Sequence, residues 1–412
     1  MVQPPNLKLM NNGPTIQPVA PSETTVIHII TTFSLGGATE NTLFSVEGLK
    51  DLGYNVRILA GPSNAGEGDL FERARQQGIR VDIVPHLVRS IHPWNDFLAL
   101  LSLTKILREE KAQIVHTHSS KAGILGRIAA LLARTPIVVH TIHGLPFHEY
   151  QGKVLYTLFR WMEKLCAKLT DKLISVTDTI REKAIQAGVG ESGQFVTVRS
   201  GFSIGEFARP GRDRNDIRKE LGLNTTDLVV GKIARFSPLK GHQYLLDAVP
   251  HVVEKVPNVK FLLVGGGELE SMYKTIVKQR GIESSVLFAG LVPLNRMADL
   301  ISVMDVVVHT SLLEGLARVL PQALAAGKPV VSFDIDGAHE AVLEGKTGFL
   351  VEPENNVQLA SAIVELLLDR KKASAFGLAG SQLVRDQWTT ESMVKGIHSV
   401  YQGLLSRKVV TT

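Results

Sequence analysis

The chain has 412 residues and a formal net charge of +5, with 44% hydrophobic and 21% charged residues. This length exceeds what one hydrophobic core ordinarily supports, so we expect a globular protein of two domains. The modest positive charge permits attraction to phosphates or to an acidic membrane surface, and it gives no reason to expect a nucleic-acid partner. The single cysteine, Cys166, excludes an intrachain disulfide, and its apolar helical surroundings favour an inert core position.

The amino-terminal residues 1–24 are rich in proline, asparagine and serine, and they lack the apolar core of a signal peptide. We expect these residues to form a flexible leader. No apolar run in the chain reaches the roughly 18 residues that a membrane-spanning helix needs. Together these features predict a cytoplasmic protein.

The first half of the chain alternates short apolar runs with helical segments, beginning with a strand at Val26–Ile30. Further strands are expected at Asn55–Ala60, Arg80–Val84, Gln113–His118, Ile137–Ile142, Lys172–Val176 and Phe195–Val198. Such alternation predicts a Rossmann-like domain, in which helices cover both faces of a parallel sheet. The first strand-to-helix loop carries Gly36 and Gly37, which would let the backbone approach a phosphate, although a tight turn explains them equally well.

Histidines gather at the ends of two neighbouring predicted strands. His116 and His118 lie on one face of the first strand, and His140 and His143 lie around the end of the next. Two histidines at this spacing can begin a metal site, but no nearby acid or cysteine completes one. We therefore expect no metal and interpret these histidines as polar side chains that line a cleft.

Residues 150–172 have the pattern of a basic amphipathic helix. The apolar stripe consists of Val154, Leu155, Leu158, Phe159, Met162, Leu165 and Leu169. The surrounding basic residues are Lys153, Arg160, Lys164, Lys168 and Lys172. A helix of this kind can lie in an anionic bilayer surface, or it can pack its stripe on the sheet while its charges are solvated. The sequence leaves both interpretations open.

The second half opens with Ser200–Pro210, which has no clear periodicity and is the best candidate for an interdomain linker. Arg235 and Lys240 then follow the predicted strand Leu228–Ala234. These two cations can hold a diphosphate from two sides, the arginine as a fork of donors and the lysine as a mobile charge. Stabilising a departing phosphate is the main requirement when a glycosyl–phosphate bond breaks. The alternative is that they are ordinary surface charges.

Two further loops, Thr310–Gly315 and Asp334–Ala338, follow neighbouring strands. The carboxyl ends of strands in an open α/β sheet are where ligands bind. Glu314 stands just before a helix and can accept hydrogen bonds from neutral hydroxyls, while Gly315 and Leu316 offer backbone N–H groups. This combination suits a sugar better than an anion. The alternative is that Glu314 only caps the helix.

Residues 306–340 resemble the E-x7-E signature of the family 4 glycosyltransferases, which are retaining enzymes with the GT-B fold. The similarity extends over roughly Val26–Leu405. In that family the first acid holds the donor sugar and the second holds the ribose of the nucleotide. Glu314 takes the first position here, whereas Gln322, which can hydrogen-bond but brings no charge, takes the second.

The resemblance implies an α/β protein of the GT-B class, with two Rossmann-like domains facing a central cleft. We place the acceptor-side domain at 25–205 and the nucleotide-sugar-binding domain at 206–388. The remaining residues, 389–412, would then form a helix that crosses back to the first domain.

The resemblance also assigns roles to individual residues. The expected catalytic group is His143, Arg235, Lys240 and Glu314. The expected donor-binding group is Gly36, Gly37, Gly266, Leu291, Gly315, Leu316, Gln322, Gly337 and Ala338. The expected acceptor-side group is Ser119 and Lys121. In the family the loop that contains Gly337 and Ala338 leaves room for the donor sugar.

The implied reaction is retaining transfer of a sugar from a nucleotide-sugar, which we expect to be UDP-linked, to a hydroxyl of a glycan or lipid-linked acceptor. The setting would be bacterial cell-surface polysaccharide synthesis, with the protein cytoplasmic or peripheral on the inner face of the plasma membrane. Neither a metal nor another cofactor is expected, because the departing phosphate oxygen can take the acceptor's proton. The alternatives are a non-hydrolysing nucleotide-sugar 2-epimerase and an inactive transferase-like binding protein.

Overall fold

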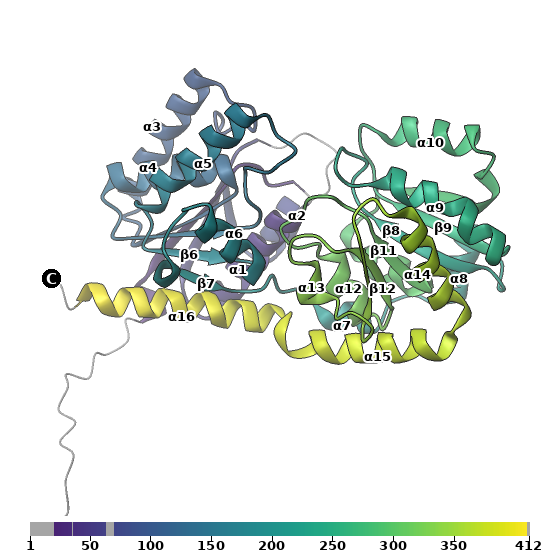
Figure 1. Cartoon of the computed structure of the whole chain (residues 1–412). Helices are drawn as coiled ribbons and strands as arrows, with labels where there is room; N and C mark the ends of the chain where they lie inside the picture. The colour runs from purple at the N-terminus through teal and green to yellow at the C-terminus, as the bar shows by residue number, and fades with distance from the viewer. Residues whose placement is uncertain (1–19, 35, 63–69, 410–412) are drawn as a thin grey trace, which may run out of the picture.

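The computed structural model describes residues 20–34, 36–62 and 70–409. Most of the predicted leader, residues 1–19, lies outside the described residues. A short 3-10 turn, Pro21–Glu23, leads into the first strand. From there the chain forms two α/β units, each built on one parallel sheet (Figure 1). This arrangement confirms the predicted fold class.

The first domain contains a seven-stranded sheet in the order β3-β2-β1-β4-β5-β6-β7. Its strands are β1 (Thr25–Ile30), β2 (Asn55–Ala60), β3 (Arg80–Ile83), β4 (Ile114–His118), β5 (Ile137–Ile142), β6 (Lys172–Ser175) and β7 (Phe195–Thr197). Its helices are α1 (Gly37–Asp51), α2 (Leu70–Gln76), α3 (Pro93–Glu109), α4 (Ser120–Ala133), α5 (Lys153–Ala167) and α6 (Asp178–Gln186). A 3-10 turn, η2 (Ser192–Gln194), precedes the last strand.

The second domain contains a six-stranded sheet in the order β10-β9-β8-β11-β12-β13. Its strands are β8 (Leu228–Ile233), β9 (Val259–Val264), β10 (Val286–Gly290), β11 (Val306–His309), β12 (Val330–Phe333) and β13 (Gly348–Val351). Its helices are α7 (Ile204–Ala208), α8 (Arg214–Glu220), α9 (His242–Lys255), α10 (Glu270–Gln279), α11 (Met297–Val303), α12 (Val319–Ala325), α13 (Ala338–Ala341), α14 (Asn356–Leu368) and α15 (Arg370–Gln387). Its 3-10 turns are η3 (Glu283–Ser285) and η4 (Leu294–Arg296).

The central strands are buried and largely apolar, because helices cover both faces of each sheet. In both sheets the strand order reverses beside the first strand of the domain, between β1 and β4 and between β8 and β11. Ligands of doubly wound sheets bind at the carboxyl ends of the strands that flank such a reversal. The fold therefore predicts one binding edge on each domain, at the loops that follow these four strands.

The segment predicted as a linker is more ordered than its composition suggests. It contains α7, and Phe202 and Phe207 are buried in the core of the second domain. The chain returns to the first domain through α16 (Thr390–Val409), which packs against α1 (Figure 1). Met393, Ile397 and Tyr401 of this helix belong to the first domain's core. Among the residues that the structure describes, no helix is both long and apolar enough to cross a bilayer.

Candidate active site

The two domains meet where the loop after β11 touches the loop after β5. A Cβ atom added to Gly315 would lie 1.6 Å from the carbonyl oxygen of His143 and 3.2 Å from the Cα of Gly144. Only glycine can occupy this position while the domains stay this close. The contact brings His143 of the first domain and Glu314 of the second to the same junction.

Glu314 is held by groups from two other loops. Its carboxylate accepts a hydrogen bond from the ammonium of Lys240 at 2.6 Å, and its backbone N–H donates to Asp336 at 2.7 Å. Arg235 is exposed just after β8, at the start of the loop that also carries Lys240. The predicted catalytic residues of the second domain are thus gathered at its binding edge, with an ion pair between the acid and the lysine.

A glycine run supports the loop that carries Arg235. Gly267 has a φ of +155°, and a Cβ atom there would lie 2.4 Å from the carbonyl oxygen of Phe236. The backbone N–H of Phe236 donates to the carbonyl of Gly266 at 3.0 Å. Gly266 in turn lies against Leu291, whose side chain is 58% exposed. The two predicted donor-binding positions, Gly266 and Leu291, therefore lie together beside the loop that carries Arg235.

Lys232, near the carboxyl end of β8, is a buried cation that our sequence reasoning missed. Its ammonium donates to the hydroxyl of Thr310 at 2.8 Å, and that hydroxyl donates to the carbonyl of Gly241. Burial, together with the nearby charge of Lys240, lowers the pKa of Lys232 to about 7, and the charge of Glu314 opposes the shift. The signal in the sequence was a lone lysine inside an otherwise apolar strand.

His143 is partly buried and contacts a group of buried imidazoles. Its Nε2 lies 3.1 Å from Nδ1 of His118, and His118 in turn contacts His28 of β1. Burial and the nearby guanidinium of Arg318 lower the pKa of His143 to about 3, so its ring is neutral near neutral pH. His28 was absent from our interpretation because it stands alone in the first strand, far from the other histidines in the sequence.

The predicted acceptor-side residues have partners of their own. The hydroxyl of Ser119 lies 2.7 Å from that of Thr31, at the edge of a cavity of about 260 Å³ that His143 also lines. The ammonium of Lys121 lies 2.5 Å from the carboxylate of Asp96 on α3. Ser119 therefore borders a space that a ligand could fill, whereas the charge of Lys121 is already neutralised.

The loop at Gly337 packs against the first domain. We expected Gly337 and Ala338 to leave room for a sugar, but both residues are buried, and a Cβ atom on Gly337 would lie 2.6 Å from Cγ2 of Thr177. The absent side chain of Gly337 makes space for the first domain in this conformation. The nearby Asp336 continues the contact through an ion pair of 2.7 Å with Lys183 of α6.

The remaining predicted donor-binding residues lie around the start of α12. Leu316 and Gln322 are partly buried, the first in the loop and the second within the helix. Gly37 lies under Arg318, whose Cδ would be 3.3 Å from a Cβ on that glycine, while Gly36 faces open space. Arg318 also forms an ion pair with Glu40 of α1, an interdomain contact that our sequence reasoning did not predict.

A larger cavity, of about 620 Å³, lies between the domains. The first domain contributes residues that include Leu145, Phe147, His148 and Arg160, and the second contributes Leu312, Leu313, Glu314, Asp334, Ile335, Asp336 and Pro353. This cavity is the central cleft that the predicted fold requires. Its size is in the range of small-molecule sites in proteins.

Known proteins resemble both halves of the chain. Residues 36–201 match the model of a glycosyl transferase 4-like domain, and residues 213–382 match that of the glycosyl transferases group 1. The UDP-Gal:alpha-D-GlcNAc-diphosphoundecaprenol alpha-1,3-galactosyltransferase of Escherichia coli is 30% identical over 353 residues, which cover 85% of this chain and 89% of that protein. The capsular polysaccharide biosynthesis glycosyltransferase CapM of Staphylococcus aureus is 27% identical and covers 78% and 85%.

Solved structures agree on the fold. The crystal structure of Anabaena HepE in complex with UDP and glucose aligns with a TM-score of 0.80 at 22% identity, over 92% of this chain and 100% of that one. With both halves of the chain and both sheets accounted for, the protein belongs to the family 4 glycosyltransferases of GT-B fold and is an enzyme of that family.

Proposed function

We propose that the protein is a retaining glycosyltransferase that moves a hexose from a UDP-sugar to a hydroxyl of a lipid-linked or glycan acceptor in cell-surface polysaccharide synthesis. The observation that carries this proposal is the pairing of Lys240, on the loop that also carries Arg235, with Glu314 at 2.6 Å at the edge of the interdomain cleft. A diphosphate would draw Lys240 away from Glu314 and leave the carboxylate free for sugar hydroxyls.

In this mechanism the main contribution to catalysis is stabilisation of the leaving diphosphate by two cations. Arg235 and Lys240 hold the diphosphate and stabilise the negative charge that develops on it as the glycosyl bond breaks. Glu314 and the neutral ring of His143 orient the sugar by hydrogen bonds. The acceptor hydroxyl attacks from the face that the diphosphate leaves, and a phosphate oxygen takes its proton. This route needs no metal and no protein nucleophile.

The acceptor is proposed to approach through the first domain. The cavity of about 260 Å³ is lined by Ser119, Ser120 and His143, and we propose that an acceptor hydroxyl placed there approaches the donor sugar beside His143. The relative from Escherichia coli is named for transfer of galactose from UDP-Gal to a diphosphoundecaprenol-linked sugar. We extend that donor and that class of acceptor to this chain as part of the proposal.

A lipid-linked acceptor requires that the enzyme reach a membrane, and α5 offers a surface for this. Val154 is 81% exposed and Leu155 48% exposed, so the apolar stripe of α5 faces outward over much of its length, and Trp161 beside it is 57% exposed. On α3, which packs against α4, Trp94 is 63% and Phe97 49% exposed. Helices α3, α4 and α5 lie on the same side of the first domain (Figure 1). We propose that this side attaches peripherally to an anionic bilayer.

The transfer reaction can be tested with the purified full chain and vesicles that contain a GlcNAc-diphosphate-lipid acceptor. The proposal expects release of the nucleoside diphosphate from one UDP-sugar, in step with a product whose new glycosidic bond keeps the donor's anomeric configuration. A product with inverted configuration would contradict the retaining mechanism. Conversion of the donor to its 2-epimer without acceptor would indicate an epimerase instead.

A further inference from the structure

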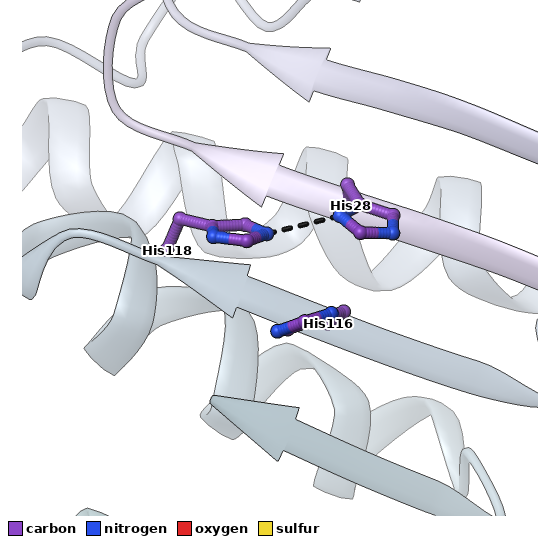
Figure 2. A group of neighbouring side chains, drawn as sticks. All are labelled: His28, His116 and His118. Carbon is purple, nitrogen blue, oxygen red and sulfur yellow. Dashed lines mark hydrogen bonds between the residues drawn. The ribbon is translucent and has the colours of Figure 1, made fainter. Parts of the chain in front are cut away.

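A chain of hydrogen bonds runs inward from His143 through two further imidazoles. Nε2 of His143 lies 3.1 Å from Nδ1 of His118, and Nε2 of His118 lies 2.9 Å from Nδ1 of His28. Figure 2 shows the rings of His28 and His118 joined by this bond, with the ring of His116 beside them. His28 and His118 are 0% exposed, so the chain passes through the interior of the first domain.

The same series of hydrogen bonds continues to the last helix of the protein. Nε2 of His28 lies 3.3 Å from the hydroxyl of Tyr401 on α16, and that hydroxyl lies 2.6 Å from Nδ1 of His116. Nε2 of His116 then lies 2.7 Å from the hydroxyl of Thr141. Tyr401 and His116 are 0% exposed. An unbroken series of hydrogen bonds therefore connects His143, at the junction of the two domains, with the core under α16.

Every imidazole in this chain is neutral. Burial lowers the pKa of His28 to about 3, and burial together with the neighbouring imidazoles holds the pKa values of His116 and His118 well below their usual range. A neutral imidazole has one N–H donor and one bare nitrogen acceptor, and a tyrosine hydroxyl has one hydrogen. The direction of any one bond in the chain therefore fixes the direction of all the others.

The distances around Tyr401 indicate which direction is taken. Hydrogen bonds donated by a hydroxyl are typically shorter than those donated by a ring N–H. The contact of 2.6 Å to His116 therefore fits donation by the tyrosine hydroxyl, and the contact of 3.3 Å to His28 fits donation by Nε2–H of that ring. Nδ1 of His28 is then an acceptor, which requires a proton on Nε2 of His118.

We propose that Tyr401, His28 and His118 are positioning residues that keep His143 in the Nε2–H tautomer, so that its bare Nδ1 is presented as a hydrogen-bond acceptor. The ligand group this nitrogen selects is a hydroxyl, of the kind that a sugar carries, in preference to a carbonyl or phosphate oxygen. The inference rests on the proposed function only for the statement that His143 contacts a sugar. The order of the protons within the chain stands independently of it.

A metal ion is the alternative occupant of this cluster. One nitrogen from each of His28, His116 and His118 lies within 4.8 Å of the others. Both nitrogens of His116 are already bonded, to Tyr401 and to Thr141, and His28 and His118 share a single N–H. An ion would have to break these bonds without a carboxylate to offset its charge. The contacts therefore favour the hydrogen-bonded chain.

The tautomer can be read directly by long-range 1H–15N correlation spectroscopy on the full chain labelled with 15N-histidine, because bare and protonated ring nitrogens have well-separated shifts. The signals of His143 are identified by their loss in His143→Gln. The proposal expects a single Nε2–H tautomer in the unmodified protein. In Tyr401→Phe, which removes only the hydroxyl, it expects a mixture of tautomers, with kcat lower by about fivefold, the loss of one hydrogen bond, and an unchanged donor KM.

Tyr54→Phe is the matched control. Tyr54 packs edge-on against Tyr401 with ring centroids 5.9 Å apart, and its hydroxyl bonds to His398 and Gln402 of α16. This variant removes a tyrosine hydroxyl from the same core and the same helix contact, but that hydroxyl takes no part in the series of hydrogen bonds from His143 to Tyr401. It should leave both the tautomer of His143 and kcat unchanged.

A second variant tests the direction of the chain. In His116→Phe the hydroxyl of Tyr401 loses its acceptor and is left with Nε2 of His28, so the order should reverse and His143 should become the Nδ1–H tautomer. A wild-type Nδ1–H tautomer, an unchanged tautomer in both variants, or a stoichiometric metal ion in the purified protein would overturn the proposal. If the tautomers behave as expected but no sugar is transferred, the proposed order of hydrogen bonds is supported and the proposed function is contradicted.

Discussion

The ammonium of Lys240 lies 2.6 Å from the carboxylate of Glu314, although the two residues come from loops that follow different strands of the second sheet. A buried or half-buried acid and base left alone at a binding edge would each carry a desolvation cost. Their pairing offsets that cost. In the proposed mechanism the diphosphate of the donor competes with Glu314 for the ammonium of Lys240, and the pair must separate before both groups can act on the donor.

Replacing Lys240 by alanine should reduce kcat by at least about 100-fold, because one of the two groups that stabilise the leaving diphosphate is lost. Circular dichroism and thermal unfolding should show an intact fold. The measurement is the rate of nucleoside diphosphate release at saturating donor. Lys274→Ala is the matched control, because Lys274 also pairs with an acid, Glu270 at 2.7 Å, but on an exposed turn of α10. Near-normal turnover in Lys240→Ala would remove this residue from the mechanism.

Gln322→Glu restores the acid that the family signature has at this position. We expect donor affinity to be kept or improved, by up to about tenfold, because a carboxylate forms stronger hydrogen bonds to ribose hydroxyls than an amide does. Isothermal titration with the nucleoside diphosphate measures the change. A large loss of affinity would mean that Gln322 donates a hydrogen bond that a carboxylate cannot provide.

Gly315→Ala tests the contact between the domains. The added Cβ would lie 1.6 Å from the carbonyl oxygen of His143, so the two loops must separate and the catalytic groups must shift. A displacement of about 1 Å can lower kcat on the order of 100-fold. Gly403→Ala on α16 adds the same atom where nothing lies within 4 Å, and it should leave the rate unchanged. Equal rates for the two variants would show that the domains work at a wider separation.

Lys232→Met should increase the free energy of unfolding relative to the unmodified protein, and this increase should be larger at pH 6 than at pH 10. The pKa of Lys232 falls from 10.5 to about 7 on folding, so the unfolded chain binds more protons between these values and the wild-type free energy of unfolding rises with pH across this window. Below pH 7 the full cost of burying the charge, a few kcal/mol, is present and the methionine removes it.

Urea unfolding of both proteins at pH 6, 8 and 10 measures this difference. The advantage of Lys232→Met should shrink as the pH rises, because the wild-type lysine becomes neutral in the folded protein and its buried charge disappears. The histidines with lowered pKa values titrate at lower pH and fall outside the window. A difference that stays constant with pH would show that the charge of Lys232 carries no folding cost.

The surface of α5 should bind vesicles that contain anionic lipid, and added salt should weaken this binding because the basic residues around the stripe contribute to it. Replacing Val154 and Trp161 by serine should lower the bound fraction in a vesicle co-sedimentation assay. Leu378→Ser is the control, since Leu378 is an exposed apolar residue, 64% accessible, on α15 of the second domain. Absence of binding at low salt would exclude α5 as a membrane surface.

Much of the fold could be predicted because its strands are short apolar runs and its helices begin and end at local signals. Gly327 and Pro329, for example, end α12 and lead into β12 as their local chemistry requires. The sequence could not decide whether α5 packs its stripe on the sheet. The structure turns Glu163 and Cys166 inward and leaves Val154 and Trp161 exposed.

The parts of the site that escaped prediction depend on contacts between distant parts of the chain. Glu40 and Arg318 form an ion pair across the domains, and no local pattern links residues so far apart. The same is true of His28 and Tyr401, which approach only because α16 returns to the first domain. The contact of Gly337 with Thr177, a residue of the other domain, escaped prediction for the same reason.

The central claim is that the Lys240–Glu314 pair is the site of a nucleotide-sugar, and thermal unfolding with UDP, GDP, ADP and their sugar conjugates tests it most directly. A ligand that binds only the folded state raises the melting temperature by mass action. We predict that the UDP series raises the melting temperature of the unmodified protein and has little effect on Lys240→Ala. Equal shifts in the two proteins, or no shift with any of these nucleotides, would contradict the claim.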